Sequence, residues 1–151
     1  MQMRRLGDTE VSAIGLGCMQ LSVREGEPSR DQAIATIHAS LDAGVRLLDT
    51  ADAYSPTGRM GHNEELVATA LRTWSGDRDS VLVATKGGHV RTHDGTWLLD
   101  GRPQHLRDAC EASLRRLGTE TIGLYQHHRP DPEVPYAETL GALAELHQEG
   151  K

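Results

Sequence analysis

Short, almost continuous apolar runs recur along the chain, each followed by a longer segment in which apolar residues return at helical spacing. The apolar runs lie at residues 14–17, 45–49, 81–85 and 122–126. Apolar residues that do not alternate with polar ones are typical of strands buried on both faces of a parallel sheet under helices. The pattern therefore predicts strand–helix units that repeat along the chain.

The segments between the strands carry the start and stop signals of helices. The first helix is predicted to begin at a capping box over residues 29–32 and to end at Gly44. The second is predicted to start at Asn63, a residue type that caps helices through its side chain. The third covers residues 103–117 and the fourth about residues 136–149. Four consecutive strand–helix units follow.

Units of this kind build either a doubly wound sheet or a (β/α)8 barrel. Residues 15–17 read Gly-Leu-Gly but no helix opens directly behind them, so the dinucleotide fingerprint of the doubly wound sheet is incomplete. Residues 86–88 read Lys-Gly-Gly, which places the lysine ahead of the glycines and does not match a P-loop. A complete barrel needs about 250 residues or more. We therefore expect residues 1–151 to form a hairpin, over residues 3–14, and half of a barrel.

Composition and charge exclude several classes of protein. With 37% hydrophobic and 25% charged residues, the chain has the composition of a soluble globular protein. Its net charge of −6 and its interspersed acidic and basic residues argue against a nucleic-acid partner. No apolar segment suits a membrane span or a secretory signal, so we expect no membrane contact and a cytoplasmic location. Cys18 and Cys110 lack partners at metal-ligand spacing, which predicts reduced thiols and no metal.

Ionisable residues close three of the predicted strands. Asp49 ends the second strand, Lys86 follows the third, and His127 and His128 follow the fourth, while Tyr54 lies in the loop after Asp49. Each alone has a simple structural explanation, such as a cap or a solvated strand end. In a barrel, however, the carboxyl ends of the strands form one rim that carries the chemistry. Together these residues predict a common site at that rim.

Several stretches of the chain, in this order and spacing, resemble the aldo-keto reductase family. They are Gly-Val-Arg-Leu-Leu-Asp-Thr-Ala-Asp-Ala-Tyr at 44–54, Asn-Glu-Glu-Leu-Val at 63–67, Ala-Thr-Lys-Gly at 84–87, Ser-Leu-Arg-Arg-Leu-Gly at 113–118 and Leu-Tyr-Gln-His-His-Arg-Pro-Asp at 124–131. The long loop over residues 92–102 is more similar to bacterial members and to relatives of the potassium-channel β subunits. The resemblance implies an α/β fold of the (β/α)8 barrel type, of which the first four units are present.

The resemblance also implies a reaction, in which an aldehyde or ketone is reduced to an alcohol with NADPH. Tyr54 would be the general acid, and the charge of Lys86 would favour its phenolate. Asp49 would hold Lys86 by an ion pair, and His128 would orient the carbonyl oxygen of the substrate. The small carbonyl compound would therefore contact Tyr54 and His128.

The adjacent histidines pose a question of register. The family pattern places its histidine two residues before Pro130, which matches His128 rather than His127. Successive side chains of a strand point to opposite faces, so we expect only one of the two rings to face the site.

Cofactor contacts are expected at Gly17, Cys18, Met19 and Asp49, although a plain turn is an equal alternative for Cys18 and Met19. In the family, the main contacts to the nucleotide come from strands five to eight. The remaining histidines show no ligand spacing, and we expect them in surface or loop positions rather than on a metal. They are His38, His62, His89, His93, His105 and His147.

A second hypothesis is a non-catalytic relative that senses nucleotides, binds a partner or assembles as a truncated half. The complete set of four site residues argues against a decayed active site. A half-barrel would leave two strand edges open, however, and we expect such a chain to self-associate.

Overall fold

Parallel strands form the central sheet of the computed structural model, which describes residues 1–23, 26, 28–56 and 58–151. In spatial order, the sheet of these described residues contains β3 (Leu16–Gly17), β4 (Leu47–Asp49), β5 (Leu82–Gly87) and β8 (Leu124–His127). The spatial order equals the chain order, as in successive units of a barrel. All carboxyl ends therefore lie at the same edge of the sheet.

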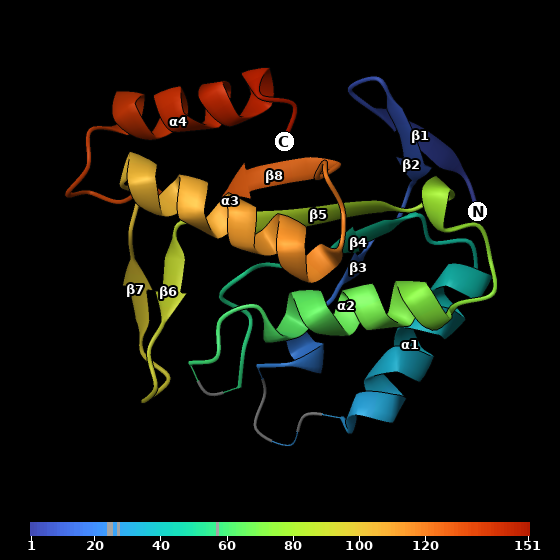
Figure 1. Ribbon diagram of the computed structural model, residues 1–151. Helices are drawn as coiled ribbons and strands as arrows, with labels where there is room; N and C mark the ends of the chain where they lie inside the picture. Colours follow the sequence, from blue (N-terminus) through green and yellow to red (C-terminus); the bar gives the residue numbers. More distant parts are fainter. Residues whose placement is uncertain (24–25, 27, 57) are drawn as a thin grey trace.

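One helix follows each strand of this sheet along the chain, and a short hairpin lies between β5 and the third helix. The helices are α1 (Arg30–Asp42), α2 (His62–Thr73), α3 (Pro103–Leu117) and α4 (Tyr136–Gln148). Figure 1 shows them in chain order from α1 at the bottom to α4 at the top, and each helix contacts the next. The predicted strand–helix units are thus confirmed, with boundaries that differ by a few residues.

Antiparallel hairpins lie outside the central sheet. β1 (Met3–Leu6) pairs with β2 (Thr9–Ser12), which confirms the hairpin predicted over residues 3–14. β6 (His89–Arg91) pairs with β7 (Trp97–Leu99), and Figure 1 shows this hairpin extending away from the sheet beside α3. The sequence pattern predicted only a loop there, because strands of three residues are too short to show a period. Short 3-10 turns, η1 (Met19–Leu21) and η2 (Arg78–Ser80), complete the connections.

Aliphatic side chains fill the space between the sheet and its helices. A first cluster joins β4 to α1 and α2, with Ile37, Leu41, Leu48, Leu66 and Val67 at most 1% exposed. A second cluster joins α3, α4 and the segment before β8. Burying such a side chain contributes roughly 1.5–3 kcal/mol, so these clusters hold the helices against one side of the sheet.

The start of α2 differs from the prediction. The helix begins at His62 behind Gly61, and Asn63 lies inside it, fully buried, without capping the helix. Gly61 has a φ of +85°, and a Cβ there would lie 2.1 Å from the Arg116 side chain. Glycine is therefore required at this turn, which frees Asn63 for contacts in the interior.

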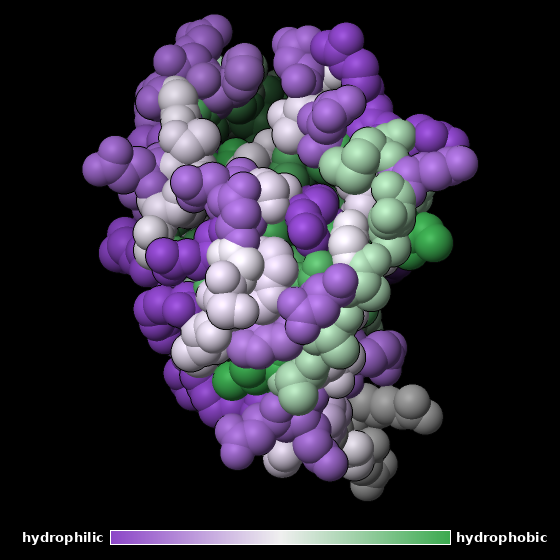
Figure 2. Space-filling view, turned by 90° about the vertical axis from the view of Figure 1, so that its right-hand side faces the viewer, coloured by the Kyte–Doolittle hydropathy of each residue, from purple (hydrophilic) through white to green (hydrophobic). Residues whose placement is uncertain are grey.

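Hydrophilic residues predominate on the face of the molecule shown in Figure 2. Hydrophobic residues form a band on this face and fill hollows between the hydrophilic ones. Within the part of the chain that the structure describes, no helix is long and apolar enough to cross a membrane.

The capping box at the start of α1 provides a test of the fold. The Ser29 Oγ accepts from the Gln32 N–H at 3.3 Å, and the Gln32 Oε1 accepts from the Ser29 N–H at 2.9 Å. Ser29→Ala should therefore lower the free energy of unfolding by about 1 kcal/mol. Ser40→Ala, in the same helix, is the matched control because its hydroxyl bonds only within the helix, to the Thr36 carbonyl. Equal losses in urea unfolding of both variants would contradict this assignment.

Candidate active site

The Lys86 ammonium contacts three oxygen atoms at the carboxyl end of the sheet. Its Nζ lies 2.8 Å from the Asp49 Oδ2, 2.8 Å from the Thr50 carbonyl oxygen and 3.2 Å from the Tyr54 hydroxyl. An ammonium has three N–H donors, so these contacts can use all of them. Only 13% of the Lys86 side chain is exposed, which makes such pairing necessary.

Asp49 is held from a second strand. Its Oδ1 accepts a hydrogen bond of 3.3 Å from the Gln126 amide of β8. Gln126 was not predicted as a site residue, yet β5 and β8 pair in a register that places it opposite Lys86. Residues paired across neighbouring strands point to the same face. Strand alignment would therefore have been the signal that identifies Gln126.

Tyr54 reaches the lysine from the loop after β4. The residue is 7% exposed, and its ring centre lies 4.9 Å from the Lys86 Nζ. The backbone around it is fixed, because the Asn63 N–H donates to the Tyr54 carbonyl at 3.1 Å. The phenol is thereby placed on the cation rather than in solvent.

Only one of the adjacent histidines faces this group. The His128 ring lies 5.5 Å from the Tyr54 ring in an edge-to-face arrangement. The backbone N–H of His128 donates to the Gly87 carbonyl at 2.9 Å. His127 instead stacks on Tyr136 of α4, with ring centres 5.9 Å apart. The structure thus brings Asp49, Tyr54, Lys86 and His128 together and leaves His127 outside.

Burial governs the charge of His128. Its pKa is lowered from 6.5 to about 4, chiefly by desolvation and then by the neighbouring His89 and Lys86. The imidazole is therefore neutral near pH 7 and keeps one N–H donor and one acceptor nitrogen.

His89 is a member of this group that the sequence-based expectation misplaced. We predicted a surface or loop position, but His89 lies in β6, is 9% exposed, and its ring is 4.3 Å from that of His128. Its other side contacts Trp97 of β7, with ring centres 5.4 Å apart. The error has the same origin as the missed hairpin, because only that hairpin folds His89 back onto His128.

The loop after β3 lies beside Asp49. Gly17 is exposed, pairs with Asp49 across the strands, and has no atom within 4 Å of the place where a Cβ would stand. Met19, the first residue of η1, is half-buried. Gly17 thus borders open space at the rim, next to the pair of Asp49 and Lys86, and Met19 lies in the turn that follows.

Of the two alternatives expected for Cys18, a cofactor contact and a plain turn, its surroundings favour the turn. The residue is fully buried, its N–H donates to the Asp49 carbonyl at 2.8 Å, and its own carbonyl accepts from the Asn63 amide at 2.9 Å. Burial also raises the pKa of its thiol to about 12. Cys18 therefore packs in the core and shapes the loop without an atom free for a ligand.

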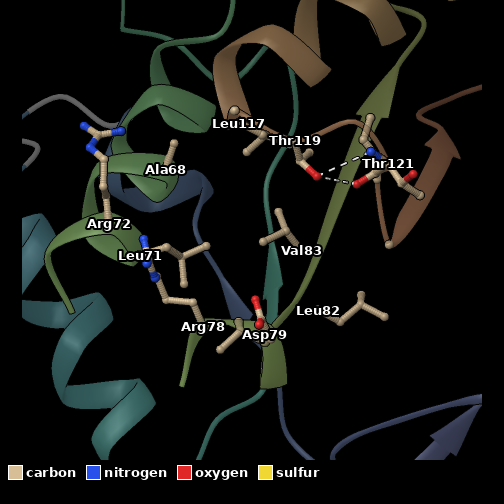
Figure 3. Close-up of a pocket in the computed structure, with 14 residues that line it drawn as sticks. Ala68, Leu71, Arg72, Arg78, Asp79, Leu82, Val83, Leu117, Thr119 and Thr121 are labelled. Carbon is tan, nitrogen blue, oxygen red and sulfur yellow. Dashed lines mark hydrogen bonds between the residues drawn. The ribbon is translucent and has the colours of Figure 1, made fainter. Parts of the chain in front are cut away.

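A pocket of about 500 Å³ lies at the opposite end of the strands. Figure 3 shows its lining residues, which include Leu71 and Arg72 of α2, Leu82 and Val83 of β5, and Leu117 of α3. None of the residues around Lys86 reaches it. In parallel α/β folds the chemistry lies at the carboxyl ends of the strands, so this pocket is not the candidate site.

Comparison with known proteins agrees with this architecture. The sequence pattern described as "Aldo/keto reductase family" matches residues 13–151. The chain belongs to the aldo-keto reductase family. The fold is of the family's barrel type, and the described α/β structure with its parallel sheet matches part of such a barrel.

Individual aldo-keto reductases match nearly the whole chain. "Probable aldo-keto reductase 1" of Glycine max is 38% identical over 143 residues, which cover 94% of this chain and 40% of that protein. Aldo-keto reductase AKR11C1 from Bacillus halodurans, in its holo form, is 37% identical with a TM-score of 0.80, and the match covers 99% of this chain and 47% of that one. Glycerol dehydrogenase AKR11B4 from Gluconobacter oxydans is 38% identical with a TM-score of 0.84, and the match covers 99% of this chain and 46% of that one. The chain thus spans less than half the length of these relatives.

The lowered pKa of His128 in this aldo-keto reductase can be tested by following the protonation of its ring. In histidine NMR spectra, the His128 ring should stay neutral from pH 7 to 5 and titrate near pH 4, against 6.5 for a free ring. Because the unfolded chain binds this proton first, the group also lowers the free energy of unfolding as the pH falls from 6.5 toward 4. The variant His128→Gln assigns the signal, and a midpoint at 6.5 or above would refute the assignment.

Proposed function

We propose that this protein reduces aldehydes or ketones to alcohols with NADPH, and that residues 1–151 supply the catalytic half of its barrel. The observation that carries the proposal is the contact of the Lys86 Nζ with both the Asp49 carboxylate and the Tyr54 hydroxyl, at 2.8 and 3.2 Å. A binding or sensing subunit has no need of an ammonium placed against a phenol. The same contact therefore favours an enzyme over a non-catalytic relative.

Tyr54 is the proton donor in this proposal. NADPH, when bound, would supply the hydride for the carbonyl carbon. The Tyr54 hydroxyl gives its proton to the carbonyl oxygen, and the Lys86 ammonium stabilises the phenolate that remains. Asp49 keeps Lys86 charged and aimed at Tyr54, because their ion pair offsets the loss of water around a side chain that is 13% exposed.

His128 orients the substrate. Its neutral ring lies edge-on to Tyr54, so an N–H of the imidazole and the hydroxyl of the phenol can meet at one carbonyl oxygen. Donors aimed at the position where negative charge develops stabilise the transition state. We therefore assign substrate contacts to Tyr54 and His128.

Gly17, Met19 and Asp49 are the residues proposed to border the nicotinamide side of NADPH. The open space beside Gly17 is compatible with a ligand that approaches the backbone closely. The Bacillus halodurans relative is described as a holo form, which is consistent with a bound cofactor in that protein. We place the remaining contacts on strands five to eight of the full-length protein.

Tyr54→Phe tests the proton donor directly. In the full-length protein, the variant should lose carbonyl reduction, by about two orders of magnitude or more in kcat, because only the transferable proton is removed. NADPH binding, followed by fluorescence titration, should remain within about threefold of the parent protein, because no proposed cofactor contact changes.

Tyr136→Phe is the matched control, since Tyr136 is 51% exposed and carries no proposed proton. Its turnover should equal that of the parent protein. If Tyr54→Phe turned over at the rate of the parent protein, Tyr54 would not be the proton donor.

The open edges of the sheet lead to a proposal about the 151-residue chain by itself. Among the described residues, β3 and β8 each pair with one neighbour in the central sheet, and Ile14, just before β3, is 64% exposed. Unpaired strand edges and apolar side chains favour pairing with further chains. We propose that the isolated chain self-associates.

Light scattering of the purified 151-residue chain measures its state of association directly. We expect a mass of at least a dimer, and weak NADPH binding by calorimetric titration because strands five to eight are not part of the sample. A monodisperse monomer that binds NADPH at micromolar affinity would contradict both expectations.

A further inference from the structure

Two adjacent polar residues at the start of α2, Asn63 and Glu64, are fully buried although neither belongs to the proposed reaction. Both have no exposed surface. Burying an amide or a carboxylate is costly unless each polar atom finds a partner. The partners of these two residues therefore indicate what the first turn of α2 does.

Glu64 holds the strand that carries Lys86. Its Oε1 accepts a hydrogen bond of 2.6 Å from the Thr85 hydroxyl, and its Oε2 accepts one of 2.6 Å from the Arg116 Nε. Thr85 directly precedes Lys86 in β5, so its side chain points to the helices while that of Lys86 points to the site. Holding Thr85 therefore fixes the direction in which the Lys86 side chain leaves the strand.

Asn63 acts on Lys86 through Thr50. Its Oδ1 accepts from the Thr50 hydroxyl at 2.6 Å, and the Thr50 carbonyl accepts from the Lys86 Nζ at 2.8 Å. The Asn63 amide donates to the Cys18 carbonyl at 2.9 Å and to the Ser22 hydroxyl at 2.7 Å. One side chain thus connects the loop after β3 with the backbone oxygen that binds the ammonium.

The charges beneath the site balance because Asp52 stays protonated. Burial and the neighbouring Glu64 raise the pKa of Asp52 to about 8, so it is largely neutral near pH 7. The Glu64 carboxylate can then pair with the Arg116 guanidinium, whose side chain is 18% exposed. This ion pair joins α2 to α3 behind β5 and limits the movement of Glu64.

We propose that Asn63 and Glu64 are positioning residues for Lys86. Asn63 acts on the ammonium through Thr50, and Glu64 acts on the strand that carries Lys86 through Thr85. The assignment of a role in catalysis rests on the proposed carbonyl reduction. In this arrangement, Lys86 is kept within reach of Tyr54 by side chains that never touch substrate or cofactor. A displacement of about 1 Å at a reacting group can lower a rate by about a hundredfold, so such positioning has a measurable effect.

The test removes one hydroxyl and then returns it. In the full-length protein, Thr85→Val deletes the donor to Glu64 with little change of shape, whereas Thr85→Ser keeps it. We expect Thr85→Val to lower kcat by about tenfold or more, with the KM for NADPH and for the carbonyl compound changed by less than about twofold. Thr85→Ser should return kcat to within about twofold of the parent protein.

Glu65→Gln is the matched control. Glu65 is the next residue of the same helical turn, but its ion pair with Arg59 lies at the surface. Its kcat should equal that of the parent protein. Thr50→Val and Thr50→Ser form a second pair on the Asn63 side, so the test remains available if Thr85→Val does not fold.

A second measurement does not depend on turnover. Lys86 and Lys151 are the two lysines of residues 1–151, so amine labelling followed by peptide mass spectrometry can use Lys151 as an internal reference. Release of the Lys86 ammonium in Thr85→Val should raise its labelling rate relative to Lys151 by about threefold or more, because an amine that leaves its buried partners is more accessible to the reagent. Thr85→Ser should label like the parent protein.

The two measurements separate the two proposals. If the parent protein reduces no carbonyl compound, the proposed function fails, while an increase in Lys86 labelling still supports the positioning of Lys86. A parent-like kcat and parent-like labelling in Thr85→Val overturn the positioning proposal. A Thr85→Ser variant that recovers neither property also overturns it, because the hydroxyl would then not be the cause.

Discussion

A cation held almost out of water is the constraint on which this structure depends. The Lys86 side chain is 13% exposed, and removing an ammonium from water without oxygen partners would cost several kcal/mol. The partners come from Asp49, from the Thr50 carbonyl and from Tyr54. The loop after β4 must therefore fold back over the end of β5, and this requirement also brings the phenol to the ammonium.

The parallel sheet makes that convergence possible. β4, β5 and β8 end at one edge, so Asp49, Lys86 and Gln126 leave neighbouring strands toward the same space. The helices supply the support from behind, where Glu64 joins Thr85 to Arg116. Polar contacts thus extend from the rim of the sheet, at Lys86, to the helices behind it, at Glu64. The buried contacts of Glu64 fix the strand from which the Lys86 side chain extends.

Several residues show where reasoning from the sequence failed. Asn63 has the side chain of a helix cap, but its partners Thr50 and Cys18 lie 13 and 45 residues away, and these contacts are formed instead. Cys18 lies in the expected loop, yet packing against α1 and α2 buries it completely. His89 reaches His128 only because a short hairpin folds back. Each error concerns a contact that local sequence does not encode.

The sequence by itself determined the repeating strand–helix units, the family and the strand ends at which ionisable residues stand, because periodicity, caps and spacing are local properties. The tertiary structure alone decided which atoms meet there. The place of Gln126 opposite Lys86, the contact of His89 with His128 and the interior role of Asn63 and Glu64 depend on register and packing between distant segments. The physical reason is that a buried polar atom takes whichever partner the assembled fold brings within hydrogen-bond distance, and that partner can lie anywhere along the chain.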